Sequence, residues 1–551
     1  MEFTSVNKIF QEAFQKYWDR PAISNYQGMT LHYRDVARRI EKMHIMFEGC
    51  GLNRGDKVAI CSRNQANWAV AFLSAMTYGA VPVPLLHEFK SSNIHHLVNH
   101  SEAKVLFVDE VIWEGLSESE MPDLLAIIQV NTFKLLYAAD DQIVEAREHL
   151  NELFGRKHPM AFTPEVLNYY EDSADELAII NYTSGTSGFS KGVMIPYRAI
   201  LSNLHFGRTV LPGLDHTKSV VSMLPSAHMY GLMFELLYEL SVGAHVHFLS
   251  RVPSPKIIMK ALSEVKPYVV IAVPLVIEKI YKNKVKPILE KEGVKFLMKV
   301  PGVNQVIMNK IKAELINAFG GEFYEVIIGG AAFNKEVEAF FKKMGFPFTV
   351  GYGMTECAPI ITYDDWSVEK LNSCGKAVPN MQVRIESRDP ETVPGEIQVK
   401  GDNVFLGYFK NEEATKEVFT EDGWFRTGDM GVLDADGSLF IRGRNKCMIL
   451  GPSGQNIYPE EVETVINSQQ YVVDSLVVED DGGLTALIYP DFPQGAKDGM
   501  DQDAFVKYME GTLSELNAVL PNYARLKKIE VMSEDFERTP KKSIKRYLYQ
   551  R

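Results

Sequence analysis

An eleven-residue segment from Tyr182 to Gly192, YTSGTSGFSKG, combines glycines, hydroxyl side chains and one lysine. Glycine lets backbone N–H groups come close to a ligand, the hydroxyls add hydrogen-bond donors, and the lysine adds a positive charge. This combination suits a polyphosphate, and the alternative is an ordinary flexible surface loop. The residues that would face phosphate are Thr183, Ser184, Gly185, Thr186, Ser187, Gly188, Ser190 and Lys191.

The segment fits neither of the two common phosphate motifs. A Walker loop has a glycine, four residues and then Gly-Lys-Ser/Thr, but here Ser190 stands where the second glycine belongs and Gly192 follows Lys191. A dinucleotide fingerprint needs G-x-G-x-x-G, and the best candidate, which starts at Gly351, ends in Glu356. The loop therefore belongs to a different nucleotide chemistry.

Five further segments carry residue types that suit a nucleotide or its substrate, and they follow the loop in a fixed order. They are LPSAHMYG at 224–231, GGAA at 329–332, GYGMTE at 351–356, DGWFRTGD at 422–429, and GRNK at 443–446 followed by GQNIYPEE at 454–461.

In this set and order the motifs resemble those of the adenylate-forming (AMP-binding) superfamily, and within it the long-chain fatty-acid–CoA ligases. The resemblance covers nearly the whole chain. It implies that ATP activates a carboxylic acid, most closely a fatty acid, to an acyl adenylate with release of pyrophosphate. The acyl group then passes to the CoA thiol, which gives acyl-CoA and AMP. Such a reaction needs no enzyme nucleophile, because the work is to bring two anions together and stabilise charge on phosphate.

The resemblance places the phosphates on the first of these segments and on the GYGMTE segment. The loop from Thr183 to Lys191 would hold the β- and γ-phosphates, and Thr355 would reach the α-phosphate. Glu356 would hold Mg²⁺, with phosphate oxygens completing the shell. Taken alone, Glu356 is equally well a solvated turn residue.

The same resemblance places the nucleoside on the remaining motifs. Tyr352 would lie against adenine, and Asp429, assisted by Arg444, would accept hydrogen bonds from the ribose hydroxyls. Taken alone, Tyr352 is ordinary core packing and Asp429 a turn-stabilising side chain. The nucleoside contacts implied in this way are those of Gly329, Gly330, Ala331, Tyr352, Gly353, Met354, Asp429 and Arg444.

One histidine is a candidate contact for the acyl group, and the GQN segment is a candidate contact for CoA. His228 lies where the family often places a residue at the mouth of the acyl pocket, and Gly454, Gln455 and Asn456 would turn toward CoA. His96 and His100 have the i, i+4 spacing of a helical metal site, but without a third ligand they are read as a solvated helix face.

The C-terminal part departs from the family at one position. The family hinge implies that the chain pivots at Lys446, for which the alternative is a plain surface lysine. The family motif Thr-Pro-x-Gly-Lys-Ile-x-Arg aligns with TPKKSIKR at 539–546, so that Ser543 stands where the catalytic lysine belongs. We expect the adjacent Lys542 to replace part of the missing charge, with Lys541 and Lys545 as weaker candidates.

The elements that must position these motifs alternate between short apolar runs and helix-length segments. Runs at 57–61, 81–85, 105–108, 220–224, 245–249, 269–273, 326–328 and 348–350 predict strands, with helices at 255–265 and 335–344 among those between them. This alternation predicts an α/β fold with parallel layers. After about residue 375 the texture is β-rich, with a hairpin turn at 434–437, and the stretch 491–503 reads as an exposed loop.

The change to β-rich segments and the family resemblance together imply a domain boundary close to the GRNK motif. A large, multi-layered N-terminal domain with parallel and mixed sheets would span residues 1–443, and a small, mobile α+β C-terminal domain residues 444–551. The length of 551 residues agrees with more than one domain.

Bulk composition narrows the partners and the compartment. The net charge of −13 argues against a general nucleic-acid binder. Five scattered cysteines without metal spacing indicate reduced thiols and a cytoplasmic protein, and the N-terminus carries no evident signal peptide. Peripheral contact with the inner face of a membrane and the oligomeric state are left open.

Two other functions stay open at this point. One is adenylation of an acyl or aryl acid with transfer to a carrier-protein thiol instead of CoA. The other is a nucleotide or acyl-adenylate binder with weak or no catalysis, which Ser543 motivates.

Overall fold

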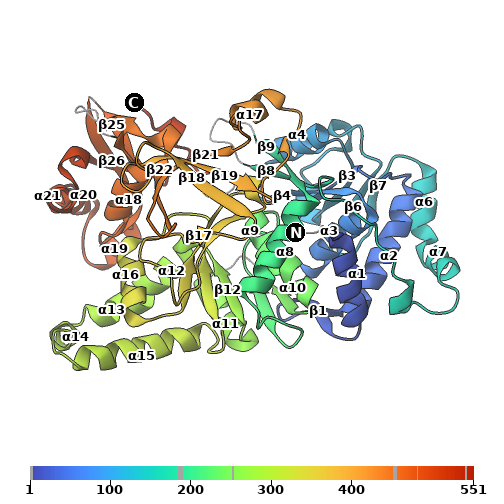
Figure 1. Cartoon of the computed structure of the whole chain (residues 1–551), viewed down its shortest axis with the longest axis horizontal. Coiled ribbons are helices and arrows are strands. Elements are labelled where there is room, and N and C mark those ends of the chain that lie inside the picture. Colours follow the sequence, from blue (N-terminus) through green and yellow to red (C-terminus); the bar gives the residue numbers. More distant parts are fainter. Residues whose placement is uncertain (1–3, 184–189, 251–253, 451–455, 481, 540–542) are drawn as a thin grey trace.

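The computed structural model describes residues 4–183, 190–250, 254–450, 456–480, 482–539 and 543–551. The first four hundred residues form a large body of layered sheets and helices, and the C-terminal residues form a smaller unit at its upper left in Figure 1. This arrangement confirms the predicted α/β class with a large N-terminal and a small C-terminal domain.

A five-stranded sheet, in the order β4-β3-β5-β6-β7, forms the part farthest from the C-terminal domain. Its strands are parallel except for β7, and the inner ones are buried apart from Lys57 and Lys104. Because helices cover the sheet, both of its faces are shielded from solvent. Its strands are therefore nearly continuous runs of apolar residues. The elements are β3 (Lys57–Cys61), β4 (Val81–Leu85), β5 (Ala103–Val108), β6 (Ala126–Gln129), β7 (Leu135–Ala138), α2 (Tyr33–Gly49), α3 (Ala66–Tyr78) and α4 (Ser91–Ser101).

Two further sheets lie in the middle of the molecule and contain most of the other predicted strands. The first has the order β10-β11-β1-β2, and the second, β12-β13-β14, is parallel throughout. Their strands are β1 (Pro21–Asn25), β2 (Thr30–His32), β10 (Ser219–Ser222), β11 (His245–Phe248), β12 (Val269–Ala272), β13 (Glu325–Ile328) and β14 (Phe348–Val350). The predicted helices at 255–265 and 335–344 are α11 (Pro255–Val265) and α16 (Lys335–Met344).

The β-rich region consists of short antiparallel sheets. The predicted hairpin forms, with Leu433 paired to Leu439 and Gly437 at a φ of 82° in the turn between them. The strands used below are β8 (Leu177–Thr183), β9 (Lys191–Pro196), β15 (Tyr352–Gly353), β18 (Met381–Glu386), β19 (Gly395–Gly401), β20 (Gly407–Tyr408), β21 (Phe425–Leu433) and β22 (Leu439–Arg444).

The C-terminal domain has a hydrophobic core of its own, which includes Ile466, Phe505 and Leu516. A three-stranded sheet, β25-β26-β27, packs against helices. Its elements are α18 (Pro459–Asn467), β25 (Val472–Asp480), β26 (Gly483–Pro490), α19 (Phe492–Lys497), α20 (Gln502–Gly511), α21 (Leu513–Val519) and β27 (Leu526–Val531).

The expectation of an exposed loop at 491–503 is wrong. Helix α19 begins there, because the Asp491 side chain accepts a hydrogen bond from the Gln494 N–H at 3.1 Å and Pro493 follows within the first turn. Phe492 then packs on Phe505, with ring centroids 5.6 Å apart. Proline and acidic residues, which suggested a loop, are the capping residues of a short helix.

No helix among the described residues has the length and apolar character needed to cross a lipid bilayer.

Candidate nucleotide site

One short segment, from Tyr352 to Cys357, connects two groups of polar side chains. It consists of strand β15 and the 3₁₀ turn Thr355–Cys357. Gly353 is required in it, because a Cβ at this position would lie 2.1 Å from the Pro359 carbonyl oxygen. The segment therefore runs close to its neighbouring backbone, with Tyr352 at one end and Glu356 at the other.

The first group is the Asp429 cluster, which consists of Tyr352, Asp429 and Arg444. The Tyr352 hydroxyl donates to Asp429 Oδ2 at 2.7 Å, and Arg444 Nε lies 3.3 Å from Asp429 Oδ1. Asp429 and Arg444 are direct partners in the β21–β22 ladder. Burial raises the pKa of the Asp429 carboxyl, while the Arg444 charge and the Tyr352 hydroxyl oppose that rise. The cluster holds a carboxylate whose second oxygen faces the arginine.

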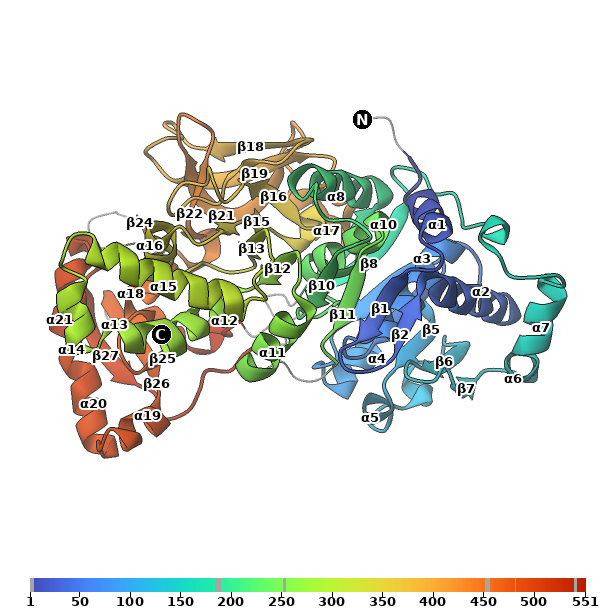
Figure 2. The same ribbon diagram turned by 90° about the horizontal axis from the view of Figure 1, so that it is seen from below.

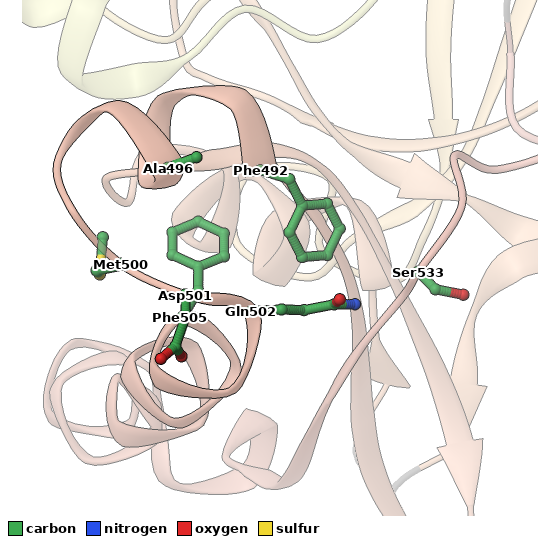
Figure 3. A pocket seen from close by; sticks show the side chains of 7 residues that line it. All are labelled: Phe492, Ala496, Met500, Asp501, Gln502, Phe505 and Ser533. Atoms are coloured by element: carbon green, nitrogen blue, oxygen red, sulfur yellow. The ribbon is translucent and has the colours of Figure 1, made fainter.

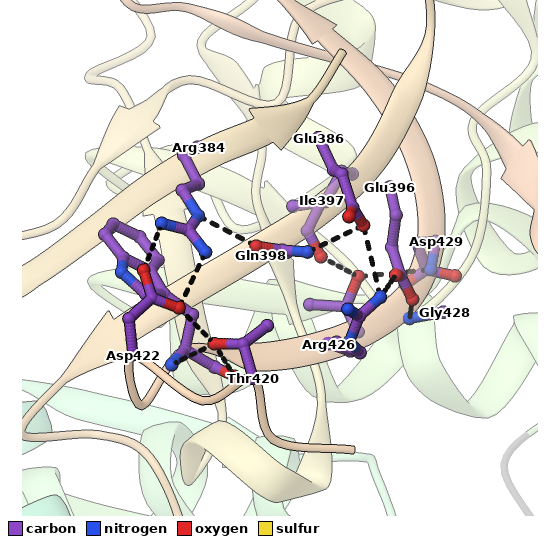
Figure 4. A network of polar contacts seen from close by, with 12 residues as sticks. Arg384, Glu386, Glu396, Ile397, Gln398, Thr420, Asp422, Arg426, Gly428 and Asp429 are labelled. Carbon is purple, nitrogen blue, oxygen red and sulfur yellow. Dashed lines mark hydrogen bonds and ion pairs between the residues drawn. The ribbon is translucent and has the colours of Figure 1, made fainter. Parts of the chain in front are cut away.

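A polar network fixes the backbone that carries Asp429, and Figure 4 shows it on β18, β19 and β21. Glu396 accepts hydrogen bonds from the Gly428 N–H at 3.2 Å and from Arg426 at 3.0 Å. Thr427 donates to the Ile397 carbonyl at 2.8 Å and accepts from the Asp429 N–H at 3.1 Å. The sequence motif pointed to Asp429 but not to Glu396, which lies on another strand.

The second group is the Glu356 cluster, which consists of Lys191, Glu356 and Tyr408. The Tyr408 hydroxyl donates to Glu356 Oε1 at 3.0 Å, and Lys191 Nζ lies 4.6 Å from the centre of the Tyr408 ring. Strand β20 brings Tyr408 there by pairing with β9, opposite Val193. Burial, and then the Glu356 charge, raise the Tyr408 pKa above its ordinary range, so this residue is a hydrogen-bond donor.

Glu356 fits a Mg²⁺ ion that is held mainly by a substrate. Its side chain is buried and one oxygen is oriented by Tyr408, while the described residues contain no group of three His, Cys, Asp or Glu side chains that could bind a metal alone. Mg²⁺ is commonly held by one or two carboxylates together with phosphate oxygens and water. A single oriented carboxylate is thus a suitable donor set for a nucleotide-bound ion.

A cavity of about 340 Å³ adjoins the Glu356 cluster, between α4, β9 and β20. Its lining residues are His96, His100, Ser190, Lys191, Gly192, Phe409, Lys410 and Asn411. His100 Nδ1 lies 2.7 Å from the Tyr182 hydroxyl, and Lys410 pairs with Glu102 at 2.8 Å. His96 is exposed, as expected of a solvated helix face, but His100 is half-buried. Two lysines in the lining favour an anion over a metal cation here.

The glycine segment 329–331 lies beside Tyr352. The Gly329 N–H donates to the Ala272 carbonyl at 3.1 Å, and the Gly351 N–H donates to the Ile328 carbonyl at 2.9 Å. The carboxyl ends of three parallel strands therefore meet at this point, which is where open α/β sheets bind ligands. Gly330 has a φ of 87°, a conformation that favours glycine.

The residue before His228 is hydrogen-bonded to strand β8, which ends at Thr183. Asn181 in β8 is buried, and its side-chain amide donates to the Ala227 carbonyl at 2.9 Å. His228 then precedes helix α9 (Met229–Leu232). The structure thus places the candidate acyl-pocket histidine next to the strand that ends at Thr183.

A model of the AMP-binding enzyme family matches residues 10–409, and a model of the AMP-binding enzyme C-terminal domain matches residues 448–551. The chain belongs to the AMP-binding enzyme family. With curated relatives named as long-chain fatty-acid–CoA ligases, this confirms the predicted class of an AMP-forming acid–CoA ligase that uses ATP and CoA.

Relatives of this AMP-binding enzyme match it along most of its length. Long chain acyl-CoA synthetase 5 of Arabidopsis thaliana is 28% identical over 523 residues, which cover 85% of this chain and 75% of that protein. Long-chain-fatty-acid–CoA ligase FadD15 of Mycobacterium bovis is 26% identical over 564 residues, which cover 93% and 89%. The solved structure of O-succinylbenzoate CoA synthetase from Bacillus subtilis, in complex with ATP and magnesium ion, has a TM-score of 0.74 at 22% identity and covers 98% of both chains.

Several predicted residues of this AMP-binding enzyme do not enter the described geometry. Ser184, Gly185, Thr186, Ser187, Gly188, Gly454, Gln455, Lys541 and Lys542 lie outside the described residues. Asn456 and Lys446 are both exposed, and the latter lies on the turn Asn445–Cys447 that follows β22. Their roles stay predictions.

A second cavity, of about 240 Å³, lies in the C-terminal domain of the enzyme, away from both clusters. Figure 3 shows Phe492 and Phe505 projecting into it from α19 and α20. None of the predicted site residues lines it. It is a gap between two short helices, and it adds nothing to the nucleotide site.

Proposed function

We propose that this enzyme activates a fatty acid as its acyl adenylate and passes the acyl group to CoA. The observation that carries the proposal is the span of the Tyr352–Glu356 segment. One end of the segment touches the carboxylate suited to a ribose, and the other carries the carboxylate suited to a phosphate-bound cation. In a nucleoside triphosphate the sugar and the phosphates likewise lie at separate positions, so one molecule could contact both carboxylates.

In the first reaction a carboxylate oxygen attacks the α-phosphorus of ATP, and the bond from that phosphorus to the bridging oxygen breaks. Pyrophosphate leaves with both bonding electrons. Asp429 with Arg444 would fix the ribose, Thr355 would contact the α-phosphate, and Lys191 would stabilise the charge on the departing pyrophosphate. Mg²⁺ held by Glu356 would neutralise phosphate charge when bound.

In the second reaction the CoA sulfur attacks the acyl carbonyl carbon, the carbon–oxygen bond to AMP breaks, and the thiol proton passes to solvent. We place the domain boundary at 443/444 and the pivot at Lys446, which lies on an exposed turn after the Asp429–Arg444 ladder pair. A rotation there would leave Asp429 in place while it moves the GQN segment at 454–456. His228 would lie at the mouth of the acyl pocket.

The fatty-acid part of the proposal rests on the names of the relatives, which are long-chain fatty-acid–CoA ligases. The decisive experiment supplies ATP, Mg²⁺ and CoA with a panel of acids that spans short, medium and long chains and aryl acids. Mass detection should find both the adenylate and the thioester, with the highest kcat/KM for a long-chain acid. A preference for an aryl acid would overturn the fatty-acid assignment.

The acceptor and the catalytic competence are tested in the same assay. If a holo-carrier protein is acylated and CoA is not, the acceptor is a carrier thiol. Ser543 favours one further candidate, a nucleotide binder without catalysis, because a serine hydroxyl carries no positive charge and this residue is exposed. Tight ATP binding without acid-dependent exchange of pyrophosphate would establish that candidate instead.

A further inference from the structure

A basic helical projection lies between β12 and β13. From Lys279 to Lys312 the sequence holds nine lysines and two glutamates, with no arginine or aspartate, although the whole chain has a net charge of −13. Positive charge is thus concentrated in one short stretch of an acidic protein. Local concentration of this kind marks a surface with an anionic partner.

Helices α14 (Glu292–Leu297) and α15 (Val303–Ala318) form the outer part of this projection, at the lower left edge in Figure 1 and at the left in Figure 2. One face of α15 is anchored, because Met308, Ile311 and Leu315 are buried in the core under β12–β14. That anchoring fixes the opposite face and the adjoining turn toward solvent.

The outward side carries large apolar side chains, where a solvated helix would carry polar ones. Phe296 is 70% exposed and Val306 68% exposed, with Leu297 and Val303 also exposed. Val303 and Val306 are three residues apart on α15 and share one face. The four residues lie within eleven positions on either side of a turn that contains Gly302, and we call them the apolar tip (Phe296, Leu297, Val303 and Val306).

Exposed lysines flank the apolar tip in the sequence. Lys291, Lys295 and Lys299 precede or flank it on α14 and the turn, and Lys310 follows one turn of α15 beyond Val306. Glu292, the only acid from 291 to 310, pairs with Lys295 at 3.2 Å. The segment thus combines exposed apolar side chains with exposed lysines.

We propose that the apolar tip and its lysines dock on the surface of an anionic lipid bilayer. Phe296, Leu297 and Val306 enter the interface between headgroups and acyl chains, while the lysine ammonium groups reach the phosphates and carboxylates of the headgroups. Each lysine near an anionic surface adds to the electrostatic attraction. A protein partner is disfavoured, because protein interfaces are depleted of lysine.

Vesicle co-sedimentation tests the proposal with the full-length protein. Binding is measured on phosphatidylcholine vesicles with and without phosphatidylserine, at low and at high salt. We expect binding that needs phosphatidylserine and weakens with salt. Charge reversal at Lys291, Lys295 and Lys299 to Glu, or Phe296→Ser with Val306→Ser, should each lower the partition coefficient by about tenfold or more.

Matched variants separate the apolar tip from general effects of charge and hydrophobicity. Val111 and Met160 are 80% and 96% exposed elsewhere, fractions at least as large as those of Phe296 and Val306, so their change to Ser also removes exposed apolar side chains. Reversal of the exposed Lys90, Lys134 and Lys416 to Glu gives the same change in net charge. Both controls should bind vesicles as the parent protein does.

Three outcomes would overturn the proposal. The first is no binding to phosphatidylserine vesicles, and the second is equal loss in the tip variants and their controls. The third is a parent protein that self-associates in sedimentation velocity through the tip without binding vesicles, which would make the partner a second copy. Thermal unfolding of each variant shows that the fold is kept. Vesicle binding is measured without substrates, so its outcome is independent of which acid the enzyme activates.

Discussion

The Asp429 cluster and the C-terminal tail differ in how their side chains are held. Asp429 has defined partners in Tyr352 and Arg444, and paired strands fix the backbone on both sides of it. In the tail, Ser543 is exposed, and a bridge joins Arg538 and Ile544. Among the described residues, hydrogen bonds run from the Thr539 N–H to the Ser543 carbonyl and from the Lys545 N–H to the Glu537 carbonyl, both at 2.8 Å.

This difference indicates which positions of the protein tolerate substitution. A residue inside a network of buried partners cannot be replaced without loss of the network, whereas an exposed hairpin can exchange one residue for its neighbour. We infer that the Asp429 cluster, which we propose to hold the ribose, keeps the family pattern because its geometry is over-determined. The tail departs from the pattern at an exposed residue, Ser543.

The largest expected effect is that of a substitution in the Asp429 cluster. Asp429→Asn removes the charge that would accept both ribose hydroxyls and keeps the size of the side chain. We expect ATP affinity to fall by about 100-fold, since hydrogen bonds to a charged group contribute roughly 1.5–3 kcal/mol each. Calorimetric titration with ATP measures the change.

Asp422→Asn is the matched control for this change. Asp422 lies in the same network and binds Arg384 at 2.6 Å, but its side chain is 58% exposed (Figure 4). Its loss should alter ATP affinity by less than about twofold, because exposed ion pairs contribute little. Equal effects of the two variants would remove the role proposed for Asp429.

The second largest effect concerns the Glu356 cluster. Glu356→Gln removes the carboxylate charge, so the Mg²⁺ concentration for half-maximal adenylate formation should rise by about tenfold or more. Tyr408→Phe removes only the orienting hydroxyl and should cause a smaller rise in the same direction. The measurement is a Mg²⁺ titration of pyrophosphate release, with full loss of activity in EDTA. A curve for Glu356→Gln that overlays the parent curve would exclude the metal role.

The third prediction concerns substitutions in the C-terminal tail. Ser543→Lys restores the charge at the family position and should raise the rate of adenylate formation by about tenfold. Lys542→Ala should lower that rate, and Lys545→Ala should not, because Lys545 pairs with Glu537 at 3.1 Å. Pyrophosphate release under saturating substrate is the readout. An unchanged rate in Lys542→Ala would show that this lysine does not supply the missing charge.

The smallest effect is expected from a residue that acts only through the backbone. Glu396→Gln weakens the hydrogen bonds to Gly428 and Arg426, which should displace Asp429 slightly and raise the KM for ATP by about threefold with kcat unchanged. Steady-state kinetics separate the two parameters. Arg384→Gln on the same sheet serves as the control, and a drop in kcat alone would contradict a positioning role for Glu396.

The sequence predicted the buried strands because they are short apolar runs with turn residues at each end. Strands such as β3 and β14 form at the predicted residues, 57–61 and 348–350, and most of their side chains are apolar and buried. The stretch 491–503 was predicted wrongly, because capping residues and loop residues are of the same types. The sequence alone therefore does not distinguish a helix cap from a loop at this stretch.

By itself the sequence determined the order of the motifs, and with it the family and the types of side chain in the site. The tertiary structure alone decided which of them meet. Tyr408 reaches Glu356, and Glu396 reaches Gly428, only because strand pairing brings together segments that are far apart in sequence. The exposure of Val306 likewise depends on the packing of the opposite face of α15. Contacts of this kind follow from strand register and helix packing, which no local pattern of residues encodes.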